Sequence, residues 1–180
     1  DDYAWVIKAW IDLYEVTFDG SWLDEALTMQ IHVFEHFSDP NSPFFFYTSD
    51  LDPALAARKK ESSDNVIPSS NSVVAENLWR LGHLKFQDPW LEQSRKMVNG
   101  LKEQVMKYPG FYANWARLAV IQSNPFYEVA ICGKDAHKLR KQLQGTCSAD
   151  RVYLGSTKDG SDLELLKGKF RPNETLIYVC

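Results

Sequence analysis

Apolar residues recur along the first part of the chain at the spacing of α-helices, and this periodicity limits the fold more than any other feature. One stripe runs over residues 2–16, a turn follows at 18–20, and a second stripe continues to about Phe37. Ser21 is a natural helix N-cap, with Asp24 three positions later. The pattern predicts an αα-hairpin whose apolar positions are Tyr3, Ile7, Trp10, Ile11, Tyr14, Leu23, Leu27, Phe34 and Phe37.

A second pair of helices is predicted over about 72–84 and 89–105, with Asp88 and Pro89 as cap and first helical residue. A shift of 68 positions, the separation of Trp22 and Trp90, superposes the two pairs. A fifth helix over 111–122 opens a third hairpin without a closing helix. The superposed residues include Trp22 and Trp90, Leu23 and Leu91, Leu13 and Leu81, Phe18 and Phe86, Val6 and Val74, and Met29 and Met97.

Hairpins of this kind do not bury their apolar faces alone, so we expect stacked neighbours, including units that precede Asp1. The segment 38–70 between the pairs is too long for a simple connector, which favours a functional loop, and 44–48 has the pattern of a strand. After Pro125 the pattern changes to strand, helix and two further strands over 127–132, 135–144, 151–154 and 176–180. We therefore expect a helical domain over 1–124 and a small α/β unit over 125–180.

Charge and composition exclude several partners. The net charge is −4, and the basic residues are scattered rather than striped, so we expect no nucleic-acid partner. The longest apolar runs are strand-sized, which argues against a membrane span. Three cysteines lie far apart without ligand-pair spacing, and His32 and His36 share a helical face without a third ligand. We expect no metal, no cofactor and a cytoplasmic location.

Several motifs resemble the spermatogenesis-associated protein 20 family, in its C-terminal part. The motifs lie at the start of the chain, along the first hairpin and across the long loop, and their spacing agrees as well as their letters. The residues that carry the resemblance are Asp1, Asp2, Tyr3, Ala4, Leu13, Tyr14, Glu15, Trp22, Leu23, Ala26, Phe45, Phe46, Lys60, Glu61, Asp64, Pro68, Ser69, Asn71, Ser72 and Val73.

The resemblance implies a thioredoxin-like domain ahead of an α/α toroid. Residues 1–124 would then supply two and a half hairpins of an (α/α)6-type ring, similar to N-acylglucosamine 2-epimerases and six-hairpin glycosidases, with a sugar-sized central pocket. The family has Gly where this chain has Asn65 and Ser70, and a Gly-rich entry where it has 42–44. Because close approach to a ligand often needs Gly, we expect a ligand contact of the family to be altered there in this chain.

The 68-residue shift places Asp2 on Ser70 and Tyr3 on Asn71, so both polar motifs open the first helix of a hairpin. Equivalent helix starts would lie on one rim, where helix N-termini favour an anionic or hydroxyl-rich ligand. Glycoside hydrolysis needs two carboxylates, and Asp2 and Glu61 are the candidate catalytic pair. The candidate substrate-binding residues are Asp1, Tyr3, Phe45, Asp64, Ser69, Asn71 and Tyr112.

The same residues have a structural explanation. Asp1, Asp2, Ser70 and Asn71 are common N-caps, and Glu61 among basic residues is typical of a loop ion pair. Three hypotheses therefore stay open: a small-sugar epimerase, isomerase or hydrolase, a non-catalytic toroid that acts as a binding module beside a thioredoxin-like domain, and a structural tail that completes a ring. In each, the remainder of the polypeptide is a partner, and in the first a small carbohydrate is another.

Overall fold

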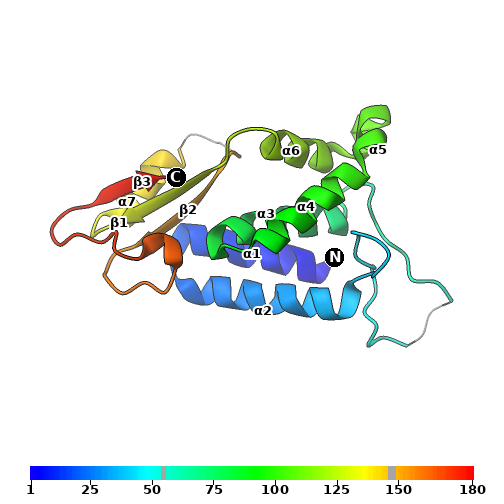
Figure 1. Ribbon diagram of the computed structural model, residues 1–180, viewed down its shortest axis with the longest axis horizontal. Helices are drawn as coiled ribbons and strands as arrows, with labels where there is room; N and C mark the ends of the chain where they lie inside the picture. Colours follow the sequence, from blue (N-terminus) through cyan, green and yellow to red (C-terminus); the bar gives the residue numbers. More distant parts are fainter. Residues whose placement is uncertain (54–55, 146–148) are drawn as a thin grey trace.

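The computed structural model describes residues 1–53, 56–145 and 149–180, and it is mainly helical with one small sheet (Figure 1). Most of the helices lie at one end of the molecule, and the sheet lies at the other end together with α7. The elements are α1 Asp2–Thr17, α2 Gly20–Phe37, α3 Ser70–Lys85, α4 Asp88–Gly100, α5 Lys102–Lys107, η1 Pro109–Phe111, α6 Ala113–Gln122, β1 Tyr127–Cys132, α7 Ala136–Leu143, β2 Arg151–Ser156, η2 Glu164–Leu166 and β3 Leu176–Val179.

The first four helices form two consecutive pairs, α1 with α2 and α3 with α4. The two helices of each pair pack side by side and run in opposite directions. In α1 and α2, the Tyr3 ring at the start lies 5.3 Å from the Phe37 ring at the end. In α3 and α4, Ser94 Oγ donates to the Ala75 carbonyl at 2.6 Å. The first helix of each pair ends at a left-handed residue, Phe18 with φ 55° and Phe86 with φ 52°. These two residues are equivalent under the 68-residue shift, so the same turn chemistry ends both helices.

Helices α1, α3 and α6 lie next to one another and run in the same direction. Ion pairs join Lys8 to Glu76 and Asp12 to Arg80, so later residues of α1 meet later residues of α3. The contacts from α3 to α6 advance in the same way, from Asn114 beside Ser72 to Arg117 beside Glu76. The described helices do not by themselves form a closed ring, and the toroid stays a prediction.

The sheet has the strand order β2-β1-β3, with β2 parallel and β3 antiparallel to the central strand β1. Side chains alternate between its faces, as strand geometry requires. Val129 and Ile131 pack with Tyr153 and Ala136 on the α7 side. The opposite face joins the helical core through Ala130, Cys132, Val152 and Leu154, and this core also includes Leu163, Leu165 and Leu166 at η2. The division at residue 125 stays a prediction.

Two sequence-based expectations are wrong. Residues 44–48 form no strand, because their backbone groups bond to separate partners: Phe46 N–H donates to the Phe37 carbonyl at 2.7 Å, and Tyr47 N–H to the Lys59 carbonyl at 2.8 Å. The helix expected over 89–105 divides into α4 and α5 at Leu101, whose side chain is buried in the core. The other expected helices and strands are confirmed, with shifts of a few residues at their ends.

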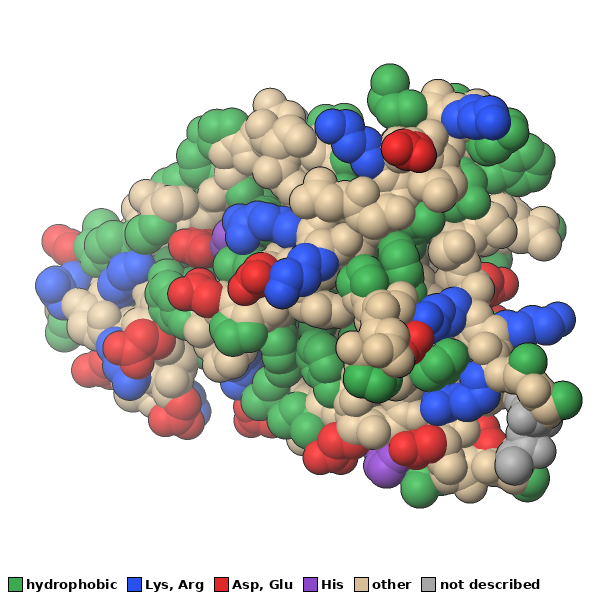
Figure 2. Space-filling view, turned by 45° about the vertical axis from the view of Figure 1, so that its right-hand side comes forward, with side chains coloured by type: hydrophobic (Ala, Val, Ile, Leu, Met, Phe, Trp, Pro, Cys, Tyr) green, Lys and Arg blue, Asp and Glu red, His purple; other side chains and the backbone are tan. Residues whose placement is uncertain are grey.

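The described parts of the long segment, 38–53 and 56–69, lie at the end of the helices opposite the sheet, near the N-terminus (Figure 1). A stretch of hydrophobic surface crosses the middle of the face in Figure 2, at the height of α1 and α2, with charged side chains on either side.

Within the described residues, no helix has the length and apolar character that a bilayer crossing requires.

Gly155 is where the sheet meets the turn between α1 and α2. A Cβ at this position would lie 2.4 Å from the Phe18 ring and 2.6 Å from the Ile131 carbonyl oxygen. Gly155→Ala should therefore lower the free energy of unfolding by about 1–3 kcal/mol, because backbone and ring must both move. Chemical denaturation measures this loss. Gly20→Ala is the control, since nothing lies within 4 Å of its Cβ position, and an equal loss there would contradict the explanation.

Candidate functional site

The starts of α1 and α3 share a small pocket, called the rim pocket below, at the N-terminal end of the helices. Its free volume is about 30 Å³. This space suits a water molecule and is far below the roughly 300 Å³ of small-molecule sites. The lining residues are Asp1, Tyr3, Ala4, Val33, Phe37, Phe45, Phe46, Tyr47, Ser70, Asn71 and Val74.

Asn71 fastens the long loop to the first turn of α3. Its Oδ1 accepts from Phe45 N–H at 2.8 Å, and its Nδ2 donates to the carbonyls of Phe45 at 3.0 Å and Glu61 at 2.9 Å. The Glu61 carboxylate accepts from the N–H and hydroxyl of Ser70 at 3.3 and 3.2 Å. Both side chains are therefore engaged in holding the loop, as caps and loop anchors are.

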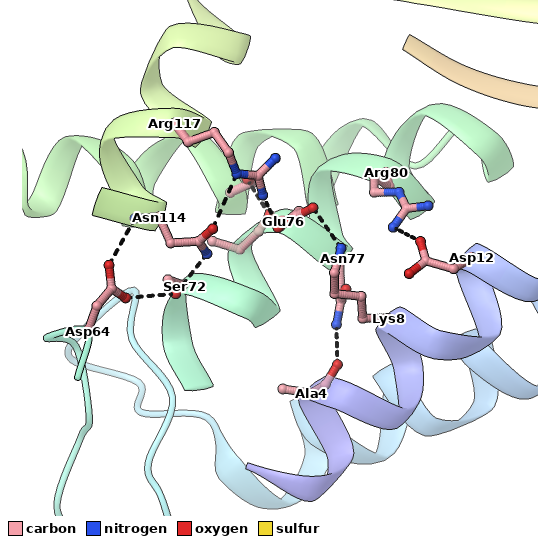
Figure 3. A network of polar contacts seen from close by, with 12 residues as sticks. Ala4, Lys8, Asp12, Asp64, Ser72, Glu76, Asn77, Arg80, Asn114 and Arg117 are labelled. Atoms are coloured by element: carbon pink, nitrogen blue, oxygen red, sulfur yellow. Dashed lines mark hydrogen bonds and ion pairs between the residues drawn. The ribbon is translucent and has the colours of Figure 1, made fainter. Parts of the chain in front are cut away.

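Asp64 forms a second attachment. One carboxylate oxygen accepts from Ser69 N–H at 2.9 Å, and the other accepts from Asn114 N–H at 2.9 Å, at the start of α6. Ser69 is buried and its hydroxyl donates to the Ser62 carbonyl at 3.2 Å. Asp64 thus joins the loop, α3 and α6 (Figure 3).

The structure brings Asp1, Tyr3, Phe45 and Asn71 to the rim pocket, but the other expected site residues lie elsewhere. Asp2 is exposed in the first turn of α1, whereas the Glu61 carboxylate is directed to Ser70. Tyr112 is half-buried beside the helical core, next to α6. Asp1 Oδ2 accepts from the Tyr47 hydroxyl at 2.9 Å.

A larger site, called the interhelical cleft below, lies on the α1, α3 and α6 layer. Its volume is about 390 Å³, within the range of small-molecule sites. Acidic, basic and aromatic side chains from all three helices meet there. The lining residues are Lys8, Asp12, Glu15, Glu76, Trp79, Arg80, Arg117, Leu118, Ile121, Phe126, Ala149 and Arg151.

Two sets of ion pairs hold the charged groups of the cleft in place (Figure 3). Glu76 of α3 binds Lys8 of α1 at 2.9 Å and also Arg117 of α6. Arg80 of α3 binds Asp12 at 2.6 Å and Glu15 at 3.0 Å, both from α1. Each buried charge on α3 is therefore shared by two opposite charges, which compensates for its loss of water.

The two buried carboxylates differ in their protonation behaviour. Burial would raise the pKa of Glu76, but the nearby Lys8 and Arg117 outweigh it and hold that pKa below its ordinary value. Burial raises the pKa of Glu15, and the opposing effect of Arg80 does not cancel it. The cleft thus contains one carboxylate that stays ionised and one that takes a proton more readily.

Trp79 supplies an aromatic wall to the cleft. Its ring lies 5.5 Å from the Phe126 ring and 4.7 Å from His83, whose Nδ1 is 2.7 Å from a Glu128 carboxylate oxygen of β1. Trp79 is buried, and among the described residues its Nε1 has no hydrogen-bond partner. The Nε1 atom is itself buried, so Trp79 contributes to the cleft through the edge of its ring and not through its N–H.

The expectations about metals were based on histidines and cysteines. In residues 1–53, 56–145 and 149–180, no three His, Cys, Asp or Glu side chains are grouped as metal ligands. The His32 and His36 rings lie 4.5 Å apart on α2, and His36 Nδ1 is 2.8 Å from Asp50. Cys132 is buried, Cys180 is exposed, and Cys147 lies outside the described residues.

Sequence reasoning centred on the rim and missed the interhelical cleft. A signal for the cleft was present: the 68-residue shift pairs Lys8 with Glu76 and Asp12 with Arg80, two opposite-charge pairs between equivalent positions. Where equivalent residues lie along the same edge of neighbouring parallel helices, as Lys8 and Glu76 do, opposite signs at the two positions indicate an interhelical ion pair.

No protein-family model matches the sequence. Proteins named spermatogenesis-associated protein 20 match over 144 residues, at 31% identity in Mus musculus and 29% in Homo sapiens. The chain is a relative of spermatogenesis-associated protein 20. The match covers 79% of this chain but 18% of each relative. Uncharacterized protein B0495.5 of Caenorhabditis elegans is 27% identical over 109 residues, which is 61% of this chain and 15% of that protein.

These matches confirm the family resemblance expected from the sequence. Because the chain spans less than a fifth of the length of the spermatogenesis-associated protein 20 relatives, the activity and partners of the whole proteins do not follow from the match. The chemistry has to be argued from the residues of this chain.

Asn71→Ala should detach the long loop from α3. The substitution removes two buried hydrogen bonds and one partly buried one, and we expect a loss of about 2–4 kcal/mol in the free energy of unfolding. Trypsin should then cut faster at the basic residues 58–60. Asn65→Ala, at an exposed position, is the control. Unchanged cleavage in the Asn71 variant would show that this side chain does not hold the loop.

Glu76→Gln should change how stability depends on pH. The unfolded-state pKa is about the ordinary 4.5 and the folded-state pKa lies below it, so the unfolded chain binds more protons in this range. Stability from Glu76 is present above pH 4.5 and is lost as pH falls through the folded-state pKa. The variant should be about 2 kcal/mol less stable at pH 7 and should lose less of its remaining stability on acidification. Urea denaturation from pH 7 to pH 3 tests this, and parallel curves for the two proteins would contradict it.

Proposed function

We propose that this chain forms one wall of a binding site for a small carbohydrate, located at the interhelical cleft. The observation that carries the proposal is the meeting of charged groups from α1, α3 and α6 beside the Trp79 and Phe126 rings, in a space of about 390 Å³. A sugar offers hydroxyl groups that bond to fixed charges and an apolar face that packs on an aromatic ring.

The charged groups are suited to recognition because they are already held in place. Arg117 and Asp12 keep about half of their side-chain surface exposed while each is bound to α3. Their free hydrogen-bonding positions are available to a hydroxyl-bearing ligand without the entropy cost of ordering two long side chains.

We propose in addition that the cleft belongs to a ring of helical hairpins. The parallel layer of α1, α3 and α6, with α2 and α4 packed against it, supports an inner wall of an (α/α)6-type toroid over 1–124, followed by the α/β unit 125–180. The cleft would then face the centre of the ring. A cytoplasmic location belongs to the same proposal.

Conversion of the sugar is a further part of this proposal. Acid–base reactions at a glycosidic or anomeric carbon use two carboxylates with different protonation states. Glu15 and Glu76 line the cleft with pKa values shifted in opposite directions, which supports them as that pair. The alternative pair from the sequence, Asp2 and Glu61, has weaker support because Glu61 caps α3.

A thermal-shift screen of the full-length protein with a sugar panel tests the site. A sugar that raises the melting temperature should bind at least about fivefold more weakly to Asp12→Asn, because this variant loses a charged acceptor that is half exposed in the cleft. Asp2→Asn should bind it normally, and Glu61→Gln is a second rim control. Loss of binding in the rim variants alone would move the site to the rim, and no response to any sugar would count against a carbohydrate ligand.

A further inference from the structure

One face of α1 carries apolar residues that remain exposed. Val6, Leu13 and Val16 are 38%, 40% and 49% exposed, and Ala9 lies between them at helical spacing. Residues at this spacing fall on a single side of the helix. This group, Val6, Ala9, Leu13 and Val16, is called the α1 stripe below.

The equivalent face of α3 is buried. The 68-residue shift turns the α1 stripe into Val74, Asn77, Leu81 and Leu84, which are 4%, 0%, 0% and 1% exposed. Asn77 Nδ2 donates to the Ala4 carbonyl of α1 at 2.8 Å (Figure 3). Val74 lines the rim pocket together with Ala4. This face of α3 is therefore the one that packs on α1.

The opposite faces of α1 and α3 also make equivalent contacts, each with the helix that follows in the layer. Lys8 of α1 contacts Glu76 of α3, and Glu76, the equivalent of Lys8, contacts Arg117 of α6. Ala4 of α1 lies against α3. Its equivalent in α3, Ser72, accepts a hydrogen bond at Oγ from Asn114 Nδ2 of α6 at 2.9 Å. The contact between α1 and α3 is thus repeated between α3 and α6, and the layer is open on the side of the α1 stripe.

We infer that the α1 stripe is the docking surface for a further helix of the same polypeptide, parallel to α1 and presenting the face that α1 presents to α3. The match to the relatives covers 18% of their length, so most of such a polypeptide lies outside this chain and can contain the docked helix. A second copy fits less well, because a two-fold interface sets identical patches together. Inside the molecule this face meets a different face, the one with Ala4 and Lys8.

The ion pairs indicate what the docked helix carries. Opposite charges face one another at equivalent positions in the pairs Lys8 with Glu76 and Asp12 with Arg80. The docked helix should therefore present an acidic residue to Lys8 and a basic residue to Asp12, four positions apart, with a small residue four positions before the acidic one.

Cysteine protection tests the docking surface independently of any ligand. Leu13→Cys would be made in the 180-residue chain and in the full-length natural polypeptide, each with Cys147 and Cys180 replaced by Ser, and the maleimide labelling rate measured. Ile31→Cys on α2 is the matched control, because Ile31 is 44% exposed and its equivalent, Asn99, is exposed too.

Both cysteines should label readily in the 180-residue chain. In the full-length polypeptide, Cys at position 13 should label at least about tenfold more slowly while Cys at position 31 keeps its rate. Equal labelling of position 13 in both proteins would overturn the inference. Protection in the 180-residue chain that disappears on dilution would overturn it in favour of a second copy.

A second variant guards against a local effect of the label. Leu13→Glu places a charge on the stripe, and it should lower the melting temperature of the full-length polypeptide but leave that of the 180-residue chain almost unchanged. Ile31→Glu should change neither. Equal small effects of both substitutions in the full-length polypeptide would contradict a buried stripe.

Discussion

The structure depends on the buried carboxylate of Glu76 and its two cationic partners. A carboxylate that is removed from water needs compensating charge close by, and here Lys8 of α1 and Arg117 of α6 supply it from opposite sides. This arrangement fixes three helices in one parallel layer with α3 in the middle. Arg80, one turn further along α3, also has two partners of opposite charge, but both of them, Asp12 and Glu15, come from α1.

The remaining features follow from the central position of α3. Its first turn receives the long loop through Asn71, Glu61 and Asp64, so these polar side chains are used for attachment and leave a pocket of water size. The charged middle of the same helix faces the interhelical cleft. The space and the partly exposed charges there favour the cleft over the rim as the place where a small ligand binds.

Much of the fold could be predicted from the sequence because apolar periodicity is a local signal. The helices of both pairs, the 68-residue shift and the α/β tail were all visible in it. The loop could not be placed in this way, since the partners of Glu61 and Asp64 depend on the path of an aperiodic segment. The run 44–48 has strand composition, but the chain folds back to Phe37 and Lys59 instead of pairing with a strand.

The candidate site was placed too close to the helix ends for a related reason. Polar residues at a helix start are ambiguous between capping and ligand binding, and here the hydrogen bonds of Asn71 and Glu61 assign both to attachment. The charged residues of the cleft stand within amphipathic helices, where a single helix suggests only a solvated face. Their pairing becomes visible when equivalent positions of successive hairpins are compared.

The most direct test of this account is a double-mutant cycle on Lys8 and Glu76, with Lys8→Met, Glu76→Gln and both together. These residues are 68 positions apart in sequence and meet in a partly buried ion pair. We expect a coupling of about 1–2 kcal/mol between the two substitutions in the free energy of unfolding at pH 7. Additive effects of the two substitutions would contradict the parallel layer on which the cleft and the docking surface depend.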